Sequence, residues 1–268
     1  MPEPPPVAPG LDPAVDAAAE GCFPAGTLRL RYVSPVDGHA DWALLLPPSG
    51  GTTWLVALHG HGSGGDQLFT RPDIRDAWLA HYRRRGLGVL SPHLRGNAWM
   101  SPAAVADLHG LLAWLRQHWG AGRVVLFSGS MGGTGNLIYA VQHPEDVRAV
   151  AALGAATDLA AYWRWCQAHP GGVIDEIAAA VAHAYGGPPG QAPAAYGAHQ
   201  VVAGAHRLSM PVLLAHGGAD ALIPVQQARI LADRLAGQAG FVYRELPNGD
   251  HDAPLHGAGG LAWLDAQL

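Results

Sequence analysis

The chain has 268 residues and a formal net charge of −5, with 49% hydrophobic and 14% charged residues. Its length and apolar content predict one α/β domain with a sizeable core, and they argue against a disordered chain or a small disulfide-stapled fold. All 16 basic residues are Arg, which excludes a Lys Schiff base, a Walker-type Lys and a kinase Lys. Two Cys are too few for a Cys₄ zinc site or a four-Cys iron–sulfur cluster. The negative charge and the absence of a long basic run argue against nucleic acid as a partner.

The first segment, residues 1–26, is rich in Pro, Ala and acidic residues, which predicts an extended N-terminal arm. It lacks the basic and apolar regions of a secretory signal, and no apolar stretch of the chain reaches the roughly 20 residues of a membrane span. We therefore expect no membrane partner and a cytoplasmic location by default, or secretion if an export signal has been removed. Whether Cys22 pairs with Cys166 stays open.

An antiparallel hairpin is predicted next. Residues 27–33 alternate between apolar and polar side chains, as a half-buried strand does. Asp37-Gly38 supplies a turn, and residues 42–46 form the returning strand.

The remaining strands have a different pattern, because they are short, continuous apolar runs of the kind found when both faces of a parallel sheet are covered. These runs are Trp54–Leu58, Gly88–Leu90, Val124–Phe127, Ala149–Leu153 and Val212–Ala215, with a last strand at Phe241–Leu246. Helical stripes at 102–119 and 225–237 separate them, the first with Ser101 as N-cap and Gly120 as a stop. This alternation predicts an α/β fold with a mostly parallel, eight-stranded sheet and helices on both faces.

One connection is unusually long. About fifty residues, 157–209, separate two of these strands, and they include Tyr162, Trp163, Trp165 and an apolar helical stripe. We interpret this segment as a small cap over the carboxyl edge of the sheet, within a catalytic domain that spans 27–268.

The first motif with chemical meaning is Ser128-Gly129-Ser130-Met131-Gly132-Gly133, between an apolar strand and a helical run. A Ser on a sharp strand-to-helix turn is exposed at the sheet edge, and the tight turn requires small residues two positions to either side. Ser128 stands where Gly is usual, and it is still small. The alternative is a Gly-rich loop selected for packing, but the context favours Ser130 as a nucleophile.

A nucleophilic Ser needs a base, and the base needs an orienting acid. Asp220 follows the strand at 212–215, and His251 follows the last strand, so Ser130, Asp220 and His251 occur in the expected order at one sheet edge. Alone, Asp220 would be interpreted as a turn or N-cap residue, and His251 as one surface His among 15. Asp250 and Asp252 are the fallback acids.

A fourth motif, His59-Gly60-His61-Gly62, directly follows the first parallel strand. Its glycines let a backbone N–H approach a substrate oxyanion, and the best donor pair is the N–H of His61 with the N–H of Met131. The spacing does not fit a phosphate-binding loop. A metal site at His59 and His61 lacks a third ligand cluster.

These motifs together resemble the α/β-hydrolase superfamily, and specifically the esterase branch of dienelactone hydrolases and prolyl oligopeptidase-type catalytic domains. The resemblance covers roughly residues 27–268. It implies Ser130 as nucleophile, His251 as general base and acid, Asp220 as orienting acid, and no cofactor or metal. The chain has no room for the propeller of the peptidases, and it carries Ser130 where a dienelactone hydrolase typically has Cys. Both departures favour a stand-alone carboxylic ester hydrolase with a small-molecule ester as its partner.

Candidate substrate-binding residues lie on loops near that edge and in the cap: His59, Arg95, Trp99, Trp163 and Trp165. The tryptophans could form an aromatic wall, and Arg95 either binds a carboxylate or makes a structural pair. This set favours short-chain, aromatic (cinnamoyl-type) or acylated-sugar esters. Amide, peptide, lactone or thioester hydrolysis in the same site, and a non-catalytic binding protein on this fold, remain the alternatives. The oligomeric state stays open.

Overall fold

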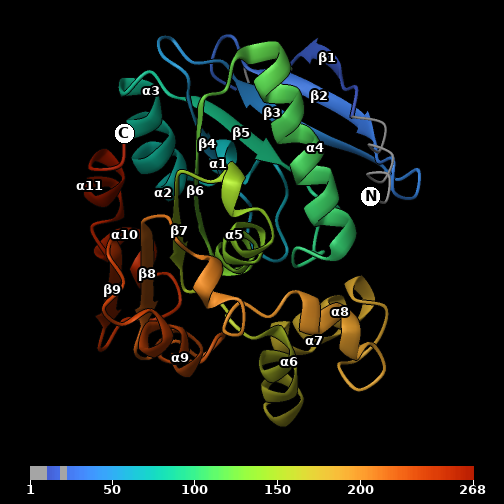
Figure 1. Ribbon diagram of the computed structural model, residues 1–268, viewed down its shortest axis with the longest axis vertical. Coiled ribbons are helices and arrows are strands. Elements are labelled where there is room, and N and C mark those ends of the chain that lie inside the picture. Colours follow the sequence, from blue (N-terminus) through green and yellow to red (C-terminus); the bar gives the residue numbers. More distant parts are fainter. Residues whose placement is uncertain (1–10, 19–22) are drawn as a thin grey trace, which may run out of the picture.

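The computed structural model describes residues 11–18 and 23–268, and their strands form one sheet. Its nine strands run in the order β1-β2-β3-β5-β4-β6-β7-β8-β9 (Figure 1). The strands are β1 (Ala14–Ala17), β2 (Leu28–Val33), β3 (Ala40–Leu46), β4 (Thr53–Val56), β5 (Gly88–Pro92), β6 (Arg123–Gly129), β7 (Ala149–Leu153), β8 (Val212–Gly217) and β9 (Phe241–Leu246).

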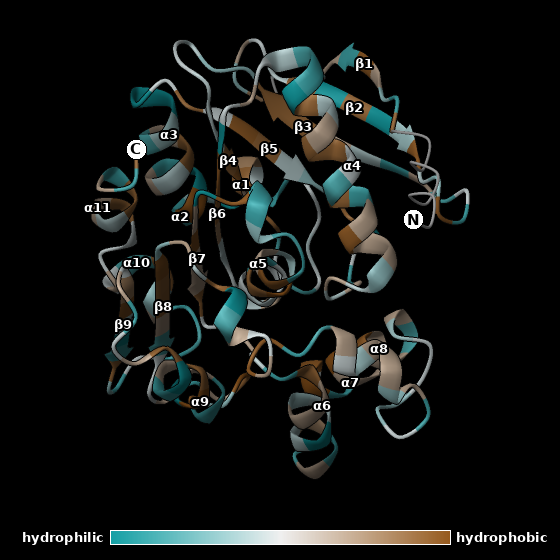
Figure 2. Cartoon of the chain, viewed as in Figure 1, coloured by the Kyte–Doolittle hydropathy of each residue, from teal (hydrophilic) through white to brown (hydrophobic). Residues whose placement is uncertain are grey.

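The sheet has an antiparallel and a parallel part. The pairs β1–β2, β2–β3 and β3–β5 are antiparallel. The pairs β5–β4, β4–β6, β6–β7, β7–β8 and β8–β9 are parallel. In Figure 2, β7 and β8 are hydrophobic along their length, while β2 carries hydrophilic residues. The parallel strands therefore lie inside the molecule, and their carboxyl ends share one edge.

Helices cover both faces of this sheet, and their apolar sides form two buried clusters. One cluster lies under α4 (Pro102–Trp119), α5 (Ser130–Gln142) and α9 (Gln226–Leu235). The other lies under the π-helical turn η1 (Arg75–Leu79), α3 (Ala80–Arg84) and α11 (Gly260–Asp265). Three short helices, α1 (Gln67–Thr70), α2 (Pro72–Ile74) and α10 (Ala253–Gly257), lie near the carboxyl edge. Two 3-10 turns are η2 (Pro144–Asp146) and η3 (Ala205–Arg207).

The α/β class, the hairpin and the mostly parallel sheet were predicted, but the sheet has nine strands where eight were expected. The extra strand is β1, inside the segment predicted as an extended arm, and it pairs with β2 from Ala14 to Ala17. Leu11 is also buried, and it packs where a Cβ on Gly110 would collide with it. The arm therefore adds to the sheet edge, although its Pro-rich composition hid this. Cys22 lies outside the described residues, and Cys166 is buried.

The long connection between β7 and β8 contains α6 (Leu159–Ala168), α7 (Val173–Ala184) and α8 (Pro193–Ala198), which lie beyond the sheet in Figure 1. The indole N–H of Trp163 on α6 donates to the carbonyl of Ala178 on α7 at 3.0 Å. The hydroxyl of Tyr162 donates to the carbonyl of Leu222 at 3.0 Å. The first bond joins two helices within the segment, and the second attaches the segment to the loop after β8. Among the described residues, no helix combines the length and apolar character needed to cross a bilayer.

Candidate active site

Ser130 lies at the junction of β6 and α5, with a positive φ of 56°. That left-handed conformation costs a residue with a side chain about 1–3 kcal/mol, and such strain concentrates at functional sites. A Cβ at Gly132 would overlap the carbonyl of Leu58, so the small residue expected there is required by close backbone approach. The turn thus presents Ser130 at the carboxyl edge of the sheet.

A continuous line of hydrogen bonds joins Ser130, His251 and Asp220. His251 Nε2 lies 2.9 Å from Ser130 Oγ, and His251 Nδ1 lies 2.7 Å from Asp220 Oδ2. Because a carboxylate only accepts, Nδ1 carries a proton and a neutral ring leaves Nε2 free to accept the Ser130 proton. Three residues from three different loops therefore have the geometry of a nucleophile, a base and an orienting acid.

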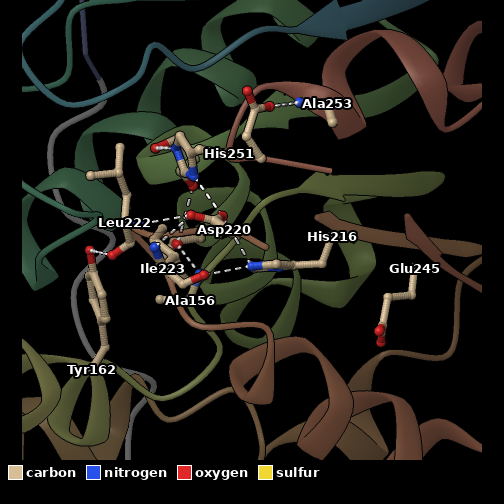
Figure 3. Close-up of polar contacts among 12 residues, drawn as sticks. Ala156, Tyr162, His216, Asp220, Leu222, Ile223, Glu245, His251 and Ala253 are labelled. Carbon is tan, nitrogen blue, oxygen red and sulfur yellow. Dashed lines mark hydrogen bonds and ion pairs between the residues drawn. The ribbon is translucent and has the colours of Figure 1, made fainter. Parts of the chain in front are cut away.

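The Asp220 side chain is fully buried, and four groups contact its carboxylate. Oδ1 accepts the backbone N–H groups of Leu222 and Ile223 at 2.8 and 2.9 Å. Oδ2 faces His251 and also His216 Nε2, at 3.2 Å (Figure 3). Burial raises the pKa of this carboxyl, but the hydrogen bonds from His216, His251 and the backbone outweigh burial and hold the pKa well below its usual range. The environment of Asp220 therefore favours its ionised form.

The second histidine on this carboxylate, His216, is the penultimate residue of β8 and is fully buried. Its Nε2 lies between the Asp220 carboxylate and the carbonyl of Ile223, which is 2.8 Å away. Both partners are acceptors, so Nε2 carries the ring proton. No motif marks His216 in the sequence, although it stands four residues before Asp220 near the end of the strand.

The fallback acids have other partners. Asp250 accepts the N–H of Ala253 at the start of α10, and Asp252 pairs with Arg71 at 3.0 Å. Helix α9 is preceded by Val225 as its N-cap residue, so Asp220 does not cap that helix. Asp220 is thus the acid that contacts His251 among the described residues.

The predicted oxyanion donors flank Ser130 from two sides. Met131 is in the first turn of α5, where backbone N–H groups have no acceptor within the helix. On the other side, a Cβ placed on Gly60 would lie 4.0 Å from the Cβ of Ser130, which puts the loop bearing His61 beside the nucleophile. The structure brings both loops together, and the donor role of their N–H groups remains a proposal.

Three side chains hold that loop. The hydroxyl of Ser128 accepts the N–H of Leu58 at 2.8 Å, and Gln67 Oε1 accepts the N–H of Gly60 at 2.9 Å. Trp99 Nε1 donates to His61 Nδ1 at 3.3 Å. Ser128, the departure from the usual Gly, thus ties the strand below the nucleophile to the predicted oxyanion loop.

A cavity of about 150 Å³ opens beside Ser130. Most of its wall is aliphatic or aromatic, from α1, α2, η1, α7 and α10. Its polar lining includes Gln67, Arg71 and His251. A largely apolar pocket with a few convergent polar groups is the usual form of a small-molecule site.

Of the predicted substrate-binding residues, His59 lines this cavity, whereas the other four do not. Arg95 is placed in a structural ion-pair cluster, with Nε 2.6 Å from buried Asp107 and NH1 2.7 Å from Asp37. Trp99 is 1% exposed and lines a separate small cavity, where it supports His61. His59 lines the main cavity, but both its ring nitrogens lie 2.8 Å from carbonyl oxygens, of Gly60 and His93, so it supports the loop.

The cap tryptophans are also positioned for packing. Trp163 joins α6 to α7, and Trp165 stacks on His169 with ring centroids 4.4 Å apart. The tryptophan that does line the cavity is Trp78, from η1. Sequence reasoning missed it because its stretch, 67–84, has no clear strand or long helical pattern, and only the fold brings it beneath Ser130.

One other cluster offers ligand atoms to a metal: His109, His143 and Asp146, whose atoms lie within 4.8 Å of one another. The Asp146 carboxylate, however, already pairs with Arg116 at 2.8 Å and accepts the hydroxyl of Tyr139 at 2.5 Å. An ion would have to displace an arginine, so the cluster is better explained as a link between α4 and α5.

Comparison with known proteins agrees with this fold. Residues 53–173 match the family model described as the alpha/beta hydrolase fold. No curated protein matches the chain by sequence. Among solved structures, an acetyl xylan esterase from Paenibacillus sp. R4 is similar over 96% of this chain and 89% of its own, with a TM-score of 0.72 and 17% identity.

Two further structures show the same likeness. The S-formylglutathione hydrolase of Staphylococcus aureus is matched over 90% of this chain and 98% of its own, with a TM-score of 0.66 and 14% identity. An esterase of Pyrococcus furiosus is matched over 90% of both chains, with a TM-score of 0.65 and 13% identity. At these identities the likeness to solved structures shows the fold alone, and that fold is the α/β-hydrolase fold.

Proposed function

We propose that this protein is a serine carboxylic ester hydrolase. The observation that carries the proposal is the line from Ser130 Oγ through His251 to Asp220, with steps of 2.9 and 2.7 Å, beside an apolar cavity. Fold alone does not define an activity. The proposal is supported by the hydrogen-bonding contact of Ser130, His251 and Asp220, the residues to which we assign the roles of nucleophile, base and orienting acid.

In the first half of the reaction, Ser130 Oγ attacks the ester carbonyl carbon and passes its proton to His251 Nε2. The carbonyl electron pair moves onto oxygen, where the N–H groups of His61 and Met131 stabilise the charge. The bond to the alcohol then breaks as His251 returns the proton to the departing oxygen. An ester between the acyl group and Ser130 remains.

In the second half, water repeats these steps. His251 takes a proton from water as its oxygen attacks the acyl carbon, and then returns a proton to Ser130 as the carboxylic acid leaves. Asp220 holds His251 in the required tautomer and stabilises the imidazolium that forms twice. His251 accepts a proton in both halves of the reaction, so the mechanism requires its neutral form.

The small cavity supports esters of short or compact acyl groups. The aromatic wall that favoured cinnamoyl-type esters was a prediction from Trp99, Trp163 and Trp165, and these side chains lie elsewhere. We therefore place short-chain esters, including acetylated sugars, first among the substrates.

The test is labelling of the purified protein with a fluorophosphonate, followed by peptide mapping. We expect label on Ser130 that is lost in Ser130→Ala and His251→Ala. The matched controls are Ser209→Ala and His206→Ala, at exposed positions outside the site, and they keep the label. A folded wild type without label would refute the proposal and favour the binding-protein alternative.

A panel of activated ester, anilide, lactone and thioester substrates then separates the bond types. A kcat/KM for esters well above that for anilides is expected. The reverse order would replace the esterase proposal by an amidase in the same site.

A further inference from the structure

The cavity beside Ser130 has a closed end and an open end. At the closed end, Leu68 and Trp78 are each 3% exposed and Ile74 is 6% exposed. At the open end, Val173 on α7 is 40% exposed. A group bound at the closed end is therefore enclosed, whereas one at the open end meets solvent.

The closed end is built by an unusual turn. Trp78 belongs to η1, a π-helical turn, and such turns are frequent at functional sites. Its indole N–H donates to the carbonyl of Leu255 at 3.2 Å, and its ring lies edge-on to Phe127 with centroids 4.8 Å apart. Trp78 is thus fixed in position from two sides.

Leu255 closes the same end from α10. Its side chain lies where a Cβ on Gly129 would be, one residue before the nucleophile. Trp78 and Leu255 are thus neighbouring parts of the wall at the closed end, and a hydrogen bond joins the Trp78 indole to the Leu255 carbonyl.

We propose that this closed end binds the acyl group, and that Trp78 and Leu255 set the largest acyl group the enzyme accepts. The whole cavity, with both its ends, measures about 150 Å³, and a cavity of this size has room for a benzene-sized group. The accepted acyl groups are then straight chains of up to about six carbons or a single phenyl ring. This inference rests on the proposed esterase function.

The order of events assigns the acyl group to this end. The alcohol must leave and water must reach the acyl carbon before the acyl group is released. Both movements need the end open to solvent, beside Val173 and Leu222. An alcohol bound at the closed end would be trapped behind the acyl-enzyme, so the acyl group is the part that fits there.

The experiment measures kcat/KM for two ester series. The first varies the acyl chain from acetate to decanoate, with benzoate, on one alcohol. The second varies the alcohol from ethyl to decyl on acetate. In the wild type we expect about a threefold to fourfold rise per acyl methylene up to the limit and a steep fall beyond it. The alcohol series should vary by only a few fold.

Two variants enlarge the closed end. Trp78→Leu and Leu255→Ala should each move the acyl optimum by two or more carbons. Leu255 is only half-buried, so we expect Leu255→Ala to fold. This variant can therefore test the inference alone if Trp78→Leu folds poorly. The matched control is Trp114→Leu, which removes a buried tryptophan from α4 and leaves the optimum in place.

An unchanged acyl optimum in folded Leu255→Ala, or a limit set by the alcohol chain, would overturn this inference. Its failure differs from failure of the esterase proposal: a protein that labels at Ser130 and hydrolyses acetate esters without the shift refutes only the assignment of the closed end.

Discussion

The side chains of Asp220 and Asp107 are both fully buried, but the networks around these two carboxylates differ in what they can do. Asp107 accepts the Ser34 hydroxyl at 2.5 Å and the Arg95 guanidinium at 2.6 Å. Asp220 accepts two backbone N–H groups and faces two imidazoles. An arginine never gives up its proton in a protein, whereas a histidine exchanges one near neutral pH. The Asp107 network can therefore only fix β2, β3 and α4, while the Asp220 network can move protons at Ser130.

The largest expected effect comes from Asp220→Asn. The amide removes the charge that stabilises the imidazolium and can impose the wrong tautomer on His251, so kcat should fall by about 10⁴-fold. Circular dichroism should show a folded protein. If ester hydrolysis fell by less than tenfold, Asp220 would not be the orienting acid, and Asp250 or Asp252 would need reconsideration.

Asp107→Asn should lower the stability of the protein and leave its activity nearly unchanged. Removing one partner of a buried ion pair leaves Arg95 less well compensated, and we expect a loss of about 2–4 kcal/mol in the free energy of unfolding. Activity per folded molecule should stay within about twofold, because the network does not contact the cavity. Urea titration and ester kinetics on one preparation measure both quantities. A large fall in kcat without loss of stability would contradict the structural role assigned to the Asp107 network.

A smaller effect is expected for His216. His216→Phe removes the hydrogen bond to Asp220 Oδ2, which is longer than the bond from His251, and kcat should fall by about tenfold. The variant His216→Gln, which restores a donor, should recover part of this loss. Equal kcat in the Phe and Gln variants would show that His216 only fills space.

The smallest effect concerns pH and stability. The pKa of Asp220 is depressed in the folded state, so its charged form contributes stability above the ordinary pKa of an Asp, about 3.9. That contribution is lost as pH falls from there toward the lower folded-state pKa. The advantage of the wild type over Asp220→Asn in unfolding free energy should thus shrink by about 1–2 kcal/mol between pH 6 and pH 2. A constant difference across that range would contradict the depressed pKa.

Much of this arrangement follows from local sequence. The apolar runs, the hairpin turn at Asp37-Gly38 and the positive-φ stop at Gly120 each act over a few residues, so they could be located without the structure. Ser130, Asp220 and His251 could be ordered because each follows a strand of a parallel sheet, whose carboxyl ends share one edge.

Tertiary structure decided the rest, because it depends on contacts between residues far apart in the chain. Arg95 lies on a loop at the expected edge, yet Asp37 and Asp107 hold it away from the cavity. Trp78 has no motif, yet a π-helical turn and Leu255 place it below the nucleophile. The strand β1 forms in a proline-rich segment because β2 offers it an open edge. Spacing along the chain thus determined the candidate catalytic residues, whereas long-range packing alone determined the shape of the cavity beside them.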